Sequence, residues 1–365
     1  MIVSGFSGND MYCLNEKGFA PGSVVVGNSV QALGFFGGIA SGLRTIAGGE
    51  IENLTQLITE GRHAAIERME KEAKAAGCQG ITGVRSELKE VSGYHEFLAI
   101  GSGVRTKGYD GDFFTTACSG QDFYCQIDAG YQPKHFVMGN VAYALGVGQS
   151  IFAWLTGVAG GEVKQYSDMY NHTRHLALTR LENEAKAVGA NSVVDIATYI
   201  LPFGPGVTEM LMVGTASYHP AFGNPERPVT SELTGEELWN LARLGYAPMR
   251  LLLGVSVYSL GLAGGIFAWF QSFSRGELES VTQVIYEARS NCLEHIIGEA
   301  KAIGADGVID IKVFIDEISA GYVEVMAIGT AIKKMPGITT QSPALIPQAI
   351  IRDRDTLFRP VTAIV

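Results

Sequence analysis

One sequence pattern occurs three times in the chain, and this repetition constrains the fold more than any other feature. The segments "SGNDMYCLNEKGFAP", "SGQDFYCQIDAGYQP" and "TGEELWNLARLGYAP" begin at residues 7, 119 and 234. Offsets of 112 and 115 residues then align the copies without a gap through 66 further positions. A period above 100 residues is too long for a solenoid unit and long enough for a small core. The chain is therefore predicted to hold three tandem domains, at 7–106, 119–219 and 234–334, and a C-terminal tail at 335–365.

Each copy has the pattern of an α+β unit with the order β-α-β-β. A short capped helix comes first, and the residues that can cap it are Ser7, Ser119 and Thr234. A β-branched strand follows, for which a bulge is predicted at the internal glycine: Gly27, Gly139 or Gly254. A glycine-rich apolar segment is next predicted as a short buried helix.

A long amphipathic helix and a closing hairpin complete each copy. The helix is predicted to begin at Glu50, Glu162 or Glu277, where an acid suits the positive end of the helix dipole. The glycine that stops it is Gly77, Gly189 or Gly304. Two strands joined by a loop of variable length follow. Each domain is thus expected to be one long helix packed on a small antiparallel sheet.

Charge and cysteine usage exclude some classes of partner. The net charge is −10 and no block of Lys and Arg occurs, which argues against nucleic acid as a partner. The five cysteines form no CxxC pair, so a reduced, cytoplasmic setting is expected. The N-terminus "MIVSGFSGND" has neither the basic nor the apolar region of an export signal.

Three charge-free segments raise the alternative of a membrane protein. Residues 18–43, 136–161 and 251–274 carry no charge and are long enough to span a bilayer. Glycines interrupt all three, and their strand-like halves alternate, so packing in a core or between domains is the favoured interpretation. Trp154 and Trp269 are then predicted to be core or interface anchors.

These residues resemble a known family. "FFGGIASGLRTIAGGE", "EGRHAAIERMEKEAKAAGCQGITGVRSE" and "EFLAIGSGV" in the first copy are similar to the YbjQ-like family of small bacterial and archaeal proteins. The second and third copies keep the same register. The resemblance implies a dodecin-like β-α-β-β fold and assembly into five-fold rings. The family is usually labelled as heavy-metal-binding, and the resemblance implies no established activity.

A metal site inherited with the fold should recur in every copy, and no set of ligands does so. His63 and His175 are equivalent, but the third copy has Ser290 at this position. No CxxC or HExxH motif occurs. His172 and His175 lie three residues apart on the second long helix and could share a metal ion. A solvated helix face is the favoured alternative, so no cofactor is predicted.

An arginine recurs in all three long helices, on or beside the buried stripe. The three are Arg62, Arg174 and Arg289. A buried guanidinium must be paired, because an unpaired buried charge is very costly. The candidate partners are the two glutamates repeated in each copy: Glu72, Glu184, Glu299, Glu96, Glu209 and Glu324. An ion pair with these residues or with a neighbouring domain is favoured over an anion or ligand site.

The sequence carries no catalytic signature, so an enzyme is not expected. The favoured function is a self-assembling structural or scaffold protein, and the alternative is a binding module for a small ligand or a metal. Three copies cannot complete a five-fold ring alone, so the chain is expected to oligomerise with itself. The favoured assembly is a stack of three rings formed by five chains, in which each ring is built from one kind of copy. Twenty chains could instead form a closed shell of twelve rings.

Overall fold

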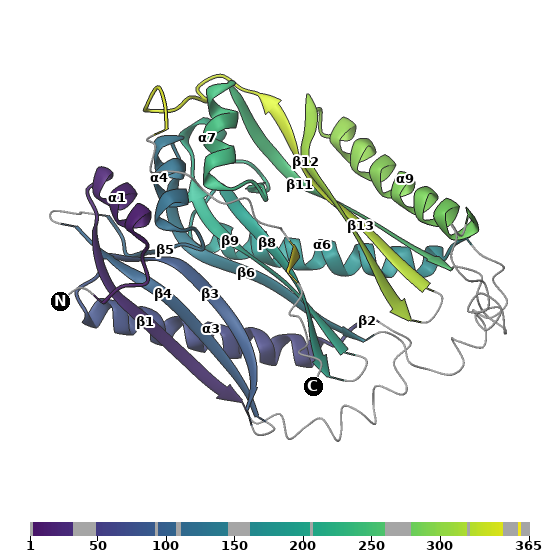
Figure 1. Ribbon diagram of the computed structural model, residues 1–365, viewed down its shortest axis with the longest axis horizontal. Helices are drawn as coiled ribbons and strands as arrows, with labels where there is room; N and C mark the ends of the chain where they lie inside the picture. Colours follow the sequence, from purple (N-terminus) through teal and green to yellow (C-terminus); the bar gives the residue numbers. More distant parts are fainter. Residues whose placement is uncertain are drawn as a thin grey trace.

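The computed structural model describes most of the chain, and the described part folds into three copies of one α+β unit (Figure 1). The described residues are 3–31, 49–91, 94–106, 111–144, 161–204, 207–259, 279–319, 322–345 and 357–358. In each copy one long helix packs on a sheet of three antiparallel strands. The predicted fold class is confirmed.

The first copy sets the pattern that the other two repeat. Its elements are α1 (Gly8–Glu16), β1 (Ala20–Gln31), β2 (Gly49–Glu50), α3 (Glu52–Ala75), β3 (Gly80–Val91) and β4 (Tyr94–Arg105). Strands β3 and β4 form the predicted hairpin, and β1 pairs antiparallel with β4, which is therefore the central strand.

The second and third copies have the same element order. The second contains α4 (Gly120–Asp128), β6 (Gln132–Ala144), β7 (Gly161–Glu162), α6 (Lys164–Ala187), β8 (Ser192–Gly204) and β9 (Val207–Tyr218). The third contains α7 (Gly235–Arg243), β11 (Tyr246–Ser259), α9 (Glu279–Ala302), β12 (Gly307–Ser319) and β13 (Tyr322–Lys334). The central strands are β9 and β13.

Both linkers and the tail add short parallel strands at sheet edges, which the sequence did not indicate. Strand β5 (Phe114–Thr115) pairs with β3, and β10 (Val229–Thr230) pairs with β8. In the tail, β14 (Leu357–Phe358) also pairs with β8. The sheets of the first two copies are therefore mixed at one edge rather than purely antiparallel.

The strand glycine does not form the predicted bulge. The pairing of β1 with β4 runs without a shift through Gly27, and the irregularity falls nearer the start of the strand. A Cβ on Gly27 would lie 2.0 Å from the Ala65 carbonyl oxygen in α3. Gly139 and Gly254 meet their own helices in the same way. The glycine is required because the helix crosses the strand at this point.

A second repeated irregularity, after the one near the start of β1, β6 and β11, is a bulge in the first hairpin strand of each copy. At this point the register shifts in β3, β8 and β12. The residue there has a left-handed backbone, with φ of 65° at Gly83, 56° at Asp195 and 52° at Asp310. Glycine and aspartate are among the residues that adopt this conformation most readily. Backbone geometry therefore accounts for the residue types at this position.

The first two long helices begin two residues later than predicted and end where predicted. Glu50 and Glu162 lie in the short strands β2 and β7, so α3 starts at Glu52 and α6 at Lys164. Strand β2 pairs with β6, and β7 pairs with β11, so each short strand belongs to the sheet of the following copy. After α3 the chain turns at Gly77, where φ is 70°.

Some predictions fall on residues that the structure does not describe. The glycine-rich segments predicted as short buried helices lie outside the described residues, as do Trp154 and Trp269. Among the helices that are described, none combines the length and apolar character needed to cross a bilayer.

Candidate functional site

The features that carry chemistry in this chain lie where one copy meets the next. Helix α3 packs on its own sheet and also on the outer face of the β6–β9 sheet, and α6 packs in the same way on the β11–β13 sheet. We call these contacts the first and second junctions. Figure 1 shows α6 lying between the sheets of the second and third copies. A helix between two sheets needs apolar surface on two sides, whereas an ordinary surface helix has one apolar stripe.

Arg62 forms the centre of the first junction. Its Nε and Nη2 donate to the two carboxylate oxygens of Glu209, at 3.1 and 2.6 Å, and both side chains are fully buried. Nη1 donates to Ser86 Oγ in the first copy, at 2.9 Å. Asn140 of β6 donates to Glu209 of β9 on the same face of the sheet, at 3.2 Å. The bidentate pair therefore has its hydrogen-bonding groups satisfied by both copies, as a buried ion pair requires.

Arg174 repeats this arrangement in the second junction. Its Nη2 donates to Glu324 of the third copy at 2.6 Å, and its Nη1 donates to the Tyr143 hydroxyl at 3.2 Å. The guanidinium also lies over the Tyr170 ring, 5.2 Å from its centroid. In both junctions the arginine of one copy thus pairs with the second repeated glutamate of the next copy.

A hydroxyl group on each helix binds the backbone of the facing strand. The Thr55 hydroxyl in α3 accepts a hydrogen bond from the Ala142 backbone N–H at 2.9 Å. At the equivalent position of α6, Ser167 accepts from the Val257 N–H at 2.9 Å. Strands β6 and β11 have no long strand on this edge, so the helix side chains satisfy donors that would otherwise be exposed.

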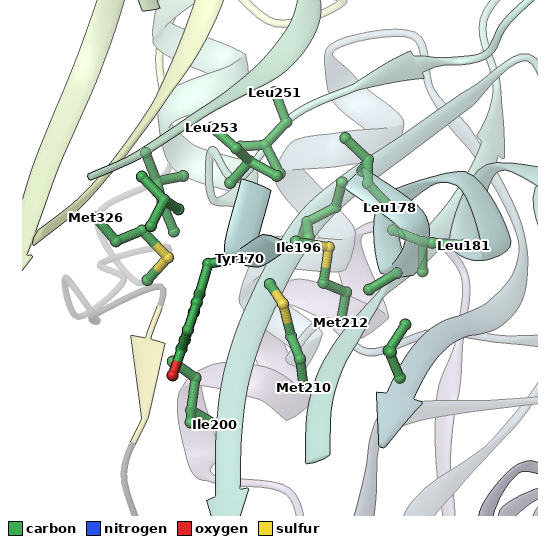
Figure 2. Close-up of a cluster of buried hydrophobic side chains, with 14 of the residues drawn as sticks. Tyr170, Leu178, Leu181, Ile196, Ile200, Met210, Met212, Leu251, Leu253 and Met326 are labelled. Carbon is green, nitrogen blue, oxygen red and sulfur yellow. The ribbon is translucent and has the colours of Figure 1, made fainter. Parts of the chain in front are cut away.

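The rest of each junction is apolar. The outward side chains of β6 that α3 covers are Phe136, Met138 and Ala142, and those of β11 that α6 covers are Leu251, Leu253 and Val257. Figure 2 shows Leu251 and Leu253 in one cluster with Tyr170 of the second copy. At about 25 cal/mol per Å² of apolar surface, this burial is the main force that holds the copies together.

A histidine–glutamate contact lies at the rim of each junction. His63 Nε2 is 2.8 Å from Glu184 Oε1, and His175 Nε2 is 3.6 Å from Glu299 Oε1. The hydrogen bond to Glu184 raises the pKa of His63 above its ordinary value, and Glu299 does the same to the pKa of His175. The protonated imidazoles are therefore the forms that these contacts favour.

The first repeated glutamate has a different role from the second. Glu72 accepts a hydrogen bond from the Val26 backbone N–H at 2.8 Å, and Glu184 accepts from the Met138 N–H at 2.8 Å. Each carboxylate thus caps the open edge of its own sheet. Neither glutamate pairs with an arginine of the repeated set.

The short helices α1, α4 and α7 form a second row of contacts between copies, which the sequence did not predict. Asp10 of α1 accepts from the Gln121 N–H at 3.2 Å, and Asp122 of α4 accepts from the Gly235 N–H at 3.0 Å. Each acid also belongs to the cap of its own helix, through Ser7 or Ser119. The capping pattern revealed these acids, but it gave no sign that they also bind the start of the next helix.

Asp128 joins three parts of the chain. Lys17 of the first copy, Trp239 of the third copy and Ser342 of the tail all donate to its carboxylate, at 2.7, 2.8 and 2.7 Å. Burial alone would raise the pKa of Asp128, but these hydrogen bonds hold it below its ordinary value. Residues 335–345 of the tail therefore pack on the short helices, with Ile338 buried in their cluster.

The candidate metal ligands are not brought together with a third ligand. His172 is exposed, and His175 contacts the Asn171 carbonyl oxygen and Glu299. Across the described ranges, no group of three or more His, Cys, Asp or Glu side chains is arranged to hold a metal ion. Metal binding by His172 and His175 stays a prediction.

Arg289 and Glu96 do not form the ion pair that their counterparts form at a junction within the chain. Arg289 is exposed on α9. Glu96 accepts from Asn28 at 3.0 Å on the outer face of the first sheet. Neither forms an ion pair with any residue that the structure describes.

Comparisons with known proteins agree with this architecture. A family model described as "Putative heavy-metal-binding" matches residues 20–107, 130–219 and 247–335. An encapsulin nanocompartment protein of Mycobacterium tuberculosis is 33% identical over 228 residues, which cover 59% of this chain and 85% of that protein. UPF0145 proteins match single copies. Those of Helicobacter hepaticus and Thermosipho africanus are 34% and 42% identical over 90 and 85 residues, covering 25% and 23% of this chain and 87% and 79% of their own lengths.

The model matches well over half of the chain, and it does so once in each of the three copies that the sequence and the structure define. The chain therefore belongs to the YbjQ-like family and contains three tandem domains of it.

Proposed function

We propose that this chain is a self-assembling structural protein whose copies build the wall of a closed compartment. The observation that carries the proposal is the similarity to the Mycobacterium tuberculosis encapsulin nanocompartment protein, which extends over 85% of that relative. The alignment is longer than any single copy, so the similarity includes the way copies follow one another. The proposed role is structural rather than catalytic.

The junctions support the proposal from physical chemistry. The same surfaces meet twice along the chain, with an equivalent buried ion pair each time. Two different surfaces that fit each other, repeated in every copy, allow copies to be added indefinitely or to close into a particle. An enzyme or a ligand-binding module would not require it.

The junctions also bear on how copies are arranged in the particle. A stack of three rings, each built from one kind of copy, assumes that every copy prefers its own kind. At both described junctions unlike copies meet instead, the first with the second and the second with the third. We therefore propose a wall in which unlike copies are neighbours, in place of the stack of homotypic rings.

Native mass spectrometry and negative-stain imaging of the untagged full chain test the function. A closed, hollow particle of many chains supports it. Twenty chains would weigh about 780 kDa and a five-chain stack about 195 kDa, from a chain of 39.0 kDa. A monomer, or open aggregates without a defined size, would overturn the proposal. A compact, non-hollow particle with stoichiometric metal by elemental analysis would favour the alternative of a metal-binding module.

A further inference from the structure

We propose that the exposed side of α9 and the outer face of the β1–β4 sheet are the two halves of a third junction, and that a second copy of this chain occupies each half. Helix α9 of one chain docks on the first sheet of the next chain. This inference rests on the proposed function, because it names the surfaces through which self-assembly occurs.

The sheet half has an exposed apolar stripe along β1. Beside Asn28, the outward side chains of β1 include Val24, Val26 and Val30, with exposed fractions of 36%, 42% and 57%. The residues at the same positions in β6 and β11 have exposed fractions of 2% or less, because the helix of the preceding copy covers them. An antiparallel sheet with a solvated face normally carries polar side chains there. The valines of β1 therefore give this strand the composition of a covered strand, and no described part of the chain covers them.

The helix half has the matching side chains. Thr282 and Arg289 are the α9 equivalents of Thr55 and Arg62, and both are exposed where their counterparts are buried. Tyr286 lies between them with an exposed fraction of 68%, and Ile297 lies further along the helix with 44%. Helix α9 thus presents the hydroxyl, the guanidinium and the apolar surface that α3 and α6 use to dock.

The charges of the two halves are complementary. Glu96 is held by Asn28 on the first sheet, just as Glu209 is held by Asn140 on the second. Glu209 also binds Arg62, and the first sheet lacks only the arginine that would bind Glu96 in the same way. Arg289 has no ion-pair partner among the residues described, and it stands at the position of the two arginines that bind such a glutamate. The bond that completes the series joins Arg289 to Glu96 of the next chain.

The short helices indicate the same order. A Cβ on Gly120 would lie 2.8 Å from the Asp10 Cβ, and a Cβ on Gly235 would lie 2.5 Å from the Asp122 carbonyl oxygen. The equivalent Gly8 has no atom within 4 Å of such a Cβ. The start of α1 therefore has the open space that the preceding copy fills at α4 and α7. The N-terminal end of α7, where Glu237 stands at the position of Asp10 and Asp122, is the surface that would fill this space from the preceding chain.

The position of the two halves permits chains to join head to tail. Helix α9 and strand β1 lie on opposite sides of the molecule in Figure 1, so one chain cannot bring its own halves together. A head-to-tail contact between unlike surfaces closes into a ring when its rotation allows and extends otherwise. Copies would follow the order first, second, third, first throughout the particle.

Two variants that each block one half test the proposal directly. Arg289→Glu blocks the helix half, and Val26→Glu blocks the sheet half; both positions are exposed in the single chain. Native mass spectrometry should find each variant alone as a 39.0 kDa monomer. An equimolar mixture can form one junction only, so it should give a two-chain particle of about 78 kDa, twice the chain mass of 39.0 kDa.

A charge exchange and a matched control complete the experiment. The double variant with Arg289→Glu and Glu96→Arg restores complementary ends and should recover the wild-type particle. Glu294→Lys reverses a charge on the same helix, at a position equivalent to Glu67, whose side chain stays 70% exposed at the first junction. It should assemble as the wild type does. Circular dichroism should show each variant folded.

The possible results separate this inference from the proposed function. Wild-type particles formed by Arg289→Glu alone and by Val26→Glu alone would overturn the inference and leave the proposed function intact. A folded mixture without the two-chain particle would overturn it as well. A wild-type chain that remains a monomer would overturn both.

Discussion

The outer faces of the first and second sheets have the same place in the repeat and different surroundings. On β6, Met138 is 2% exposed beneath α3, whereas Val26 at the equivalent position of β1 is 42% exposed. Both residues are apolar. The comparison teaches that the apolar character of this strand face does not depend on whether the same chain covers it. A covering partner explains the first sheet as α3 explains the second.

The long helices give the same comparison in reverse. Arg62 and Arg174 are fully buried between two sheets, and Arg289 is exposed on a helix that contacts one sheet. The three arginines therefore stand at equivalent positions of the repeat, and they differ in whether a following copy is present in the chain. Substitutions at equivalent positions can separate what the position contributes from what the neighbouring copy contributes.

The largest difference is expected for the arginines. Arg62→Ala leaves the buried Glu209 carboxylate without its cation, and breaking a buried pair in this way costs about 3–5 kcal/mol of unfolding free energy. Arg289→Ala removes an exposed side chain and should change the stability of the monomer by less than about 0.5 kcal/mol. Urea unfolding of both variants at a concentration that keeps them monomeric measures the difference. Equal effects at the two positions would show that Arg62 does not depend on the second copy.

The glycines at the start of the short helices should show a smaller difference. Gly235→Ala places a methyl group against the Asp122 carbonyl oxygen, and overpacking of this kind costs about 1–3 kcal/mol. Gly8→Ala meets open space and should alter stability by less than about 0.5 kcal/mol. Thermal unfolding of the two variants compares them. A Gly235→Ala variant as stable as the wild type would show that α4 and α7 can separate without cost.

The sequence predicted the copies, their long helices, their hairpins and the burial of Arg62 and Arg174, because each is encoded by a local period or by a residue repeated in register. The same prediction was wrong for Arg289, which is exposed within the single chain. The partner of Arg62 could not be chosen, since Glu209 is 147 residues away and belongs to another copy. One signal was present. Within the otherwise alternating strand, Val24, Val25 and Val26 are apolar at successive positions, which is typical of a strand covered on both faces.

Other errors came from backbone geometry that composition does not encode. The glycine of the first strand was interpreted as a bulge, although its role is to let α3 approach, and this depends on where a distant helix crosses. The residue types at Gly83, Asp195 and Asp310 are likewise set by left-handed φ angles, a backbone requirement that the sequence alone did not indicate. Both cases needed the tertiary arrangement, because the same residue types serve several local structures.

The smallest expected effect concerns pH. It again distinguishes the first and second junctions, which have a histidine at the rim, from the proposed third junction. Glu184 raises the folded-state pKa of His63 above the ordinary value of 6.5, so this contact stabilises the first junction fully below pH 6.5 and loses that contribution as the pH rises through the folded-state pKa. The melting temperature of the wild type should therefore fall between about pH 6 and pH 8 by roughly 1 °C more than that of His63→Gln, since the half-exposed pair is screened by solvent.

The histidines of the second copy supply the matching controls. His175→Gln should reduce the pH dependence in the same direction, because Glu299 raises the pKa of His175 by the same kind of contact. His172→Gln changes an exposed histidine one turn away and should leave the pH dependence as it is in the wild type. The third copy has Ser290 at the position equivalent to His63 and His175. The proposed junction between chains should therefore lack the pH-dependent histidine contact. If the melting temperature of the His63→Gln, His175→Gln double variant fell over this pH range as much as that of the wild type, the pH sensitivity would lie elsewhere.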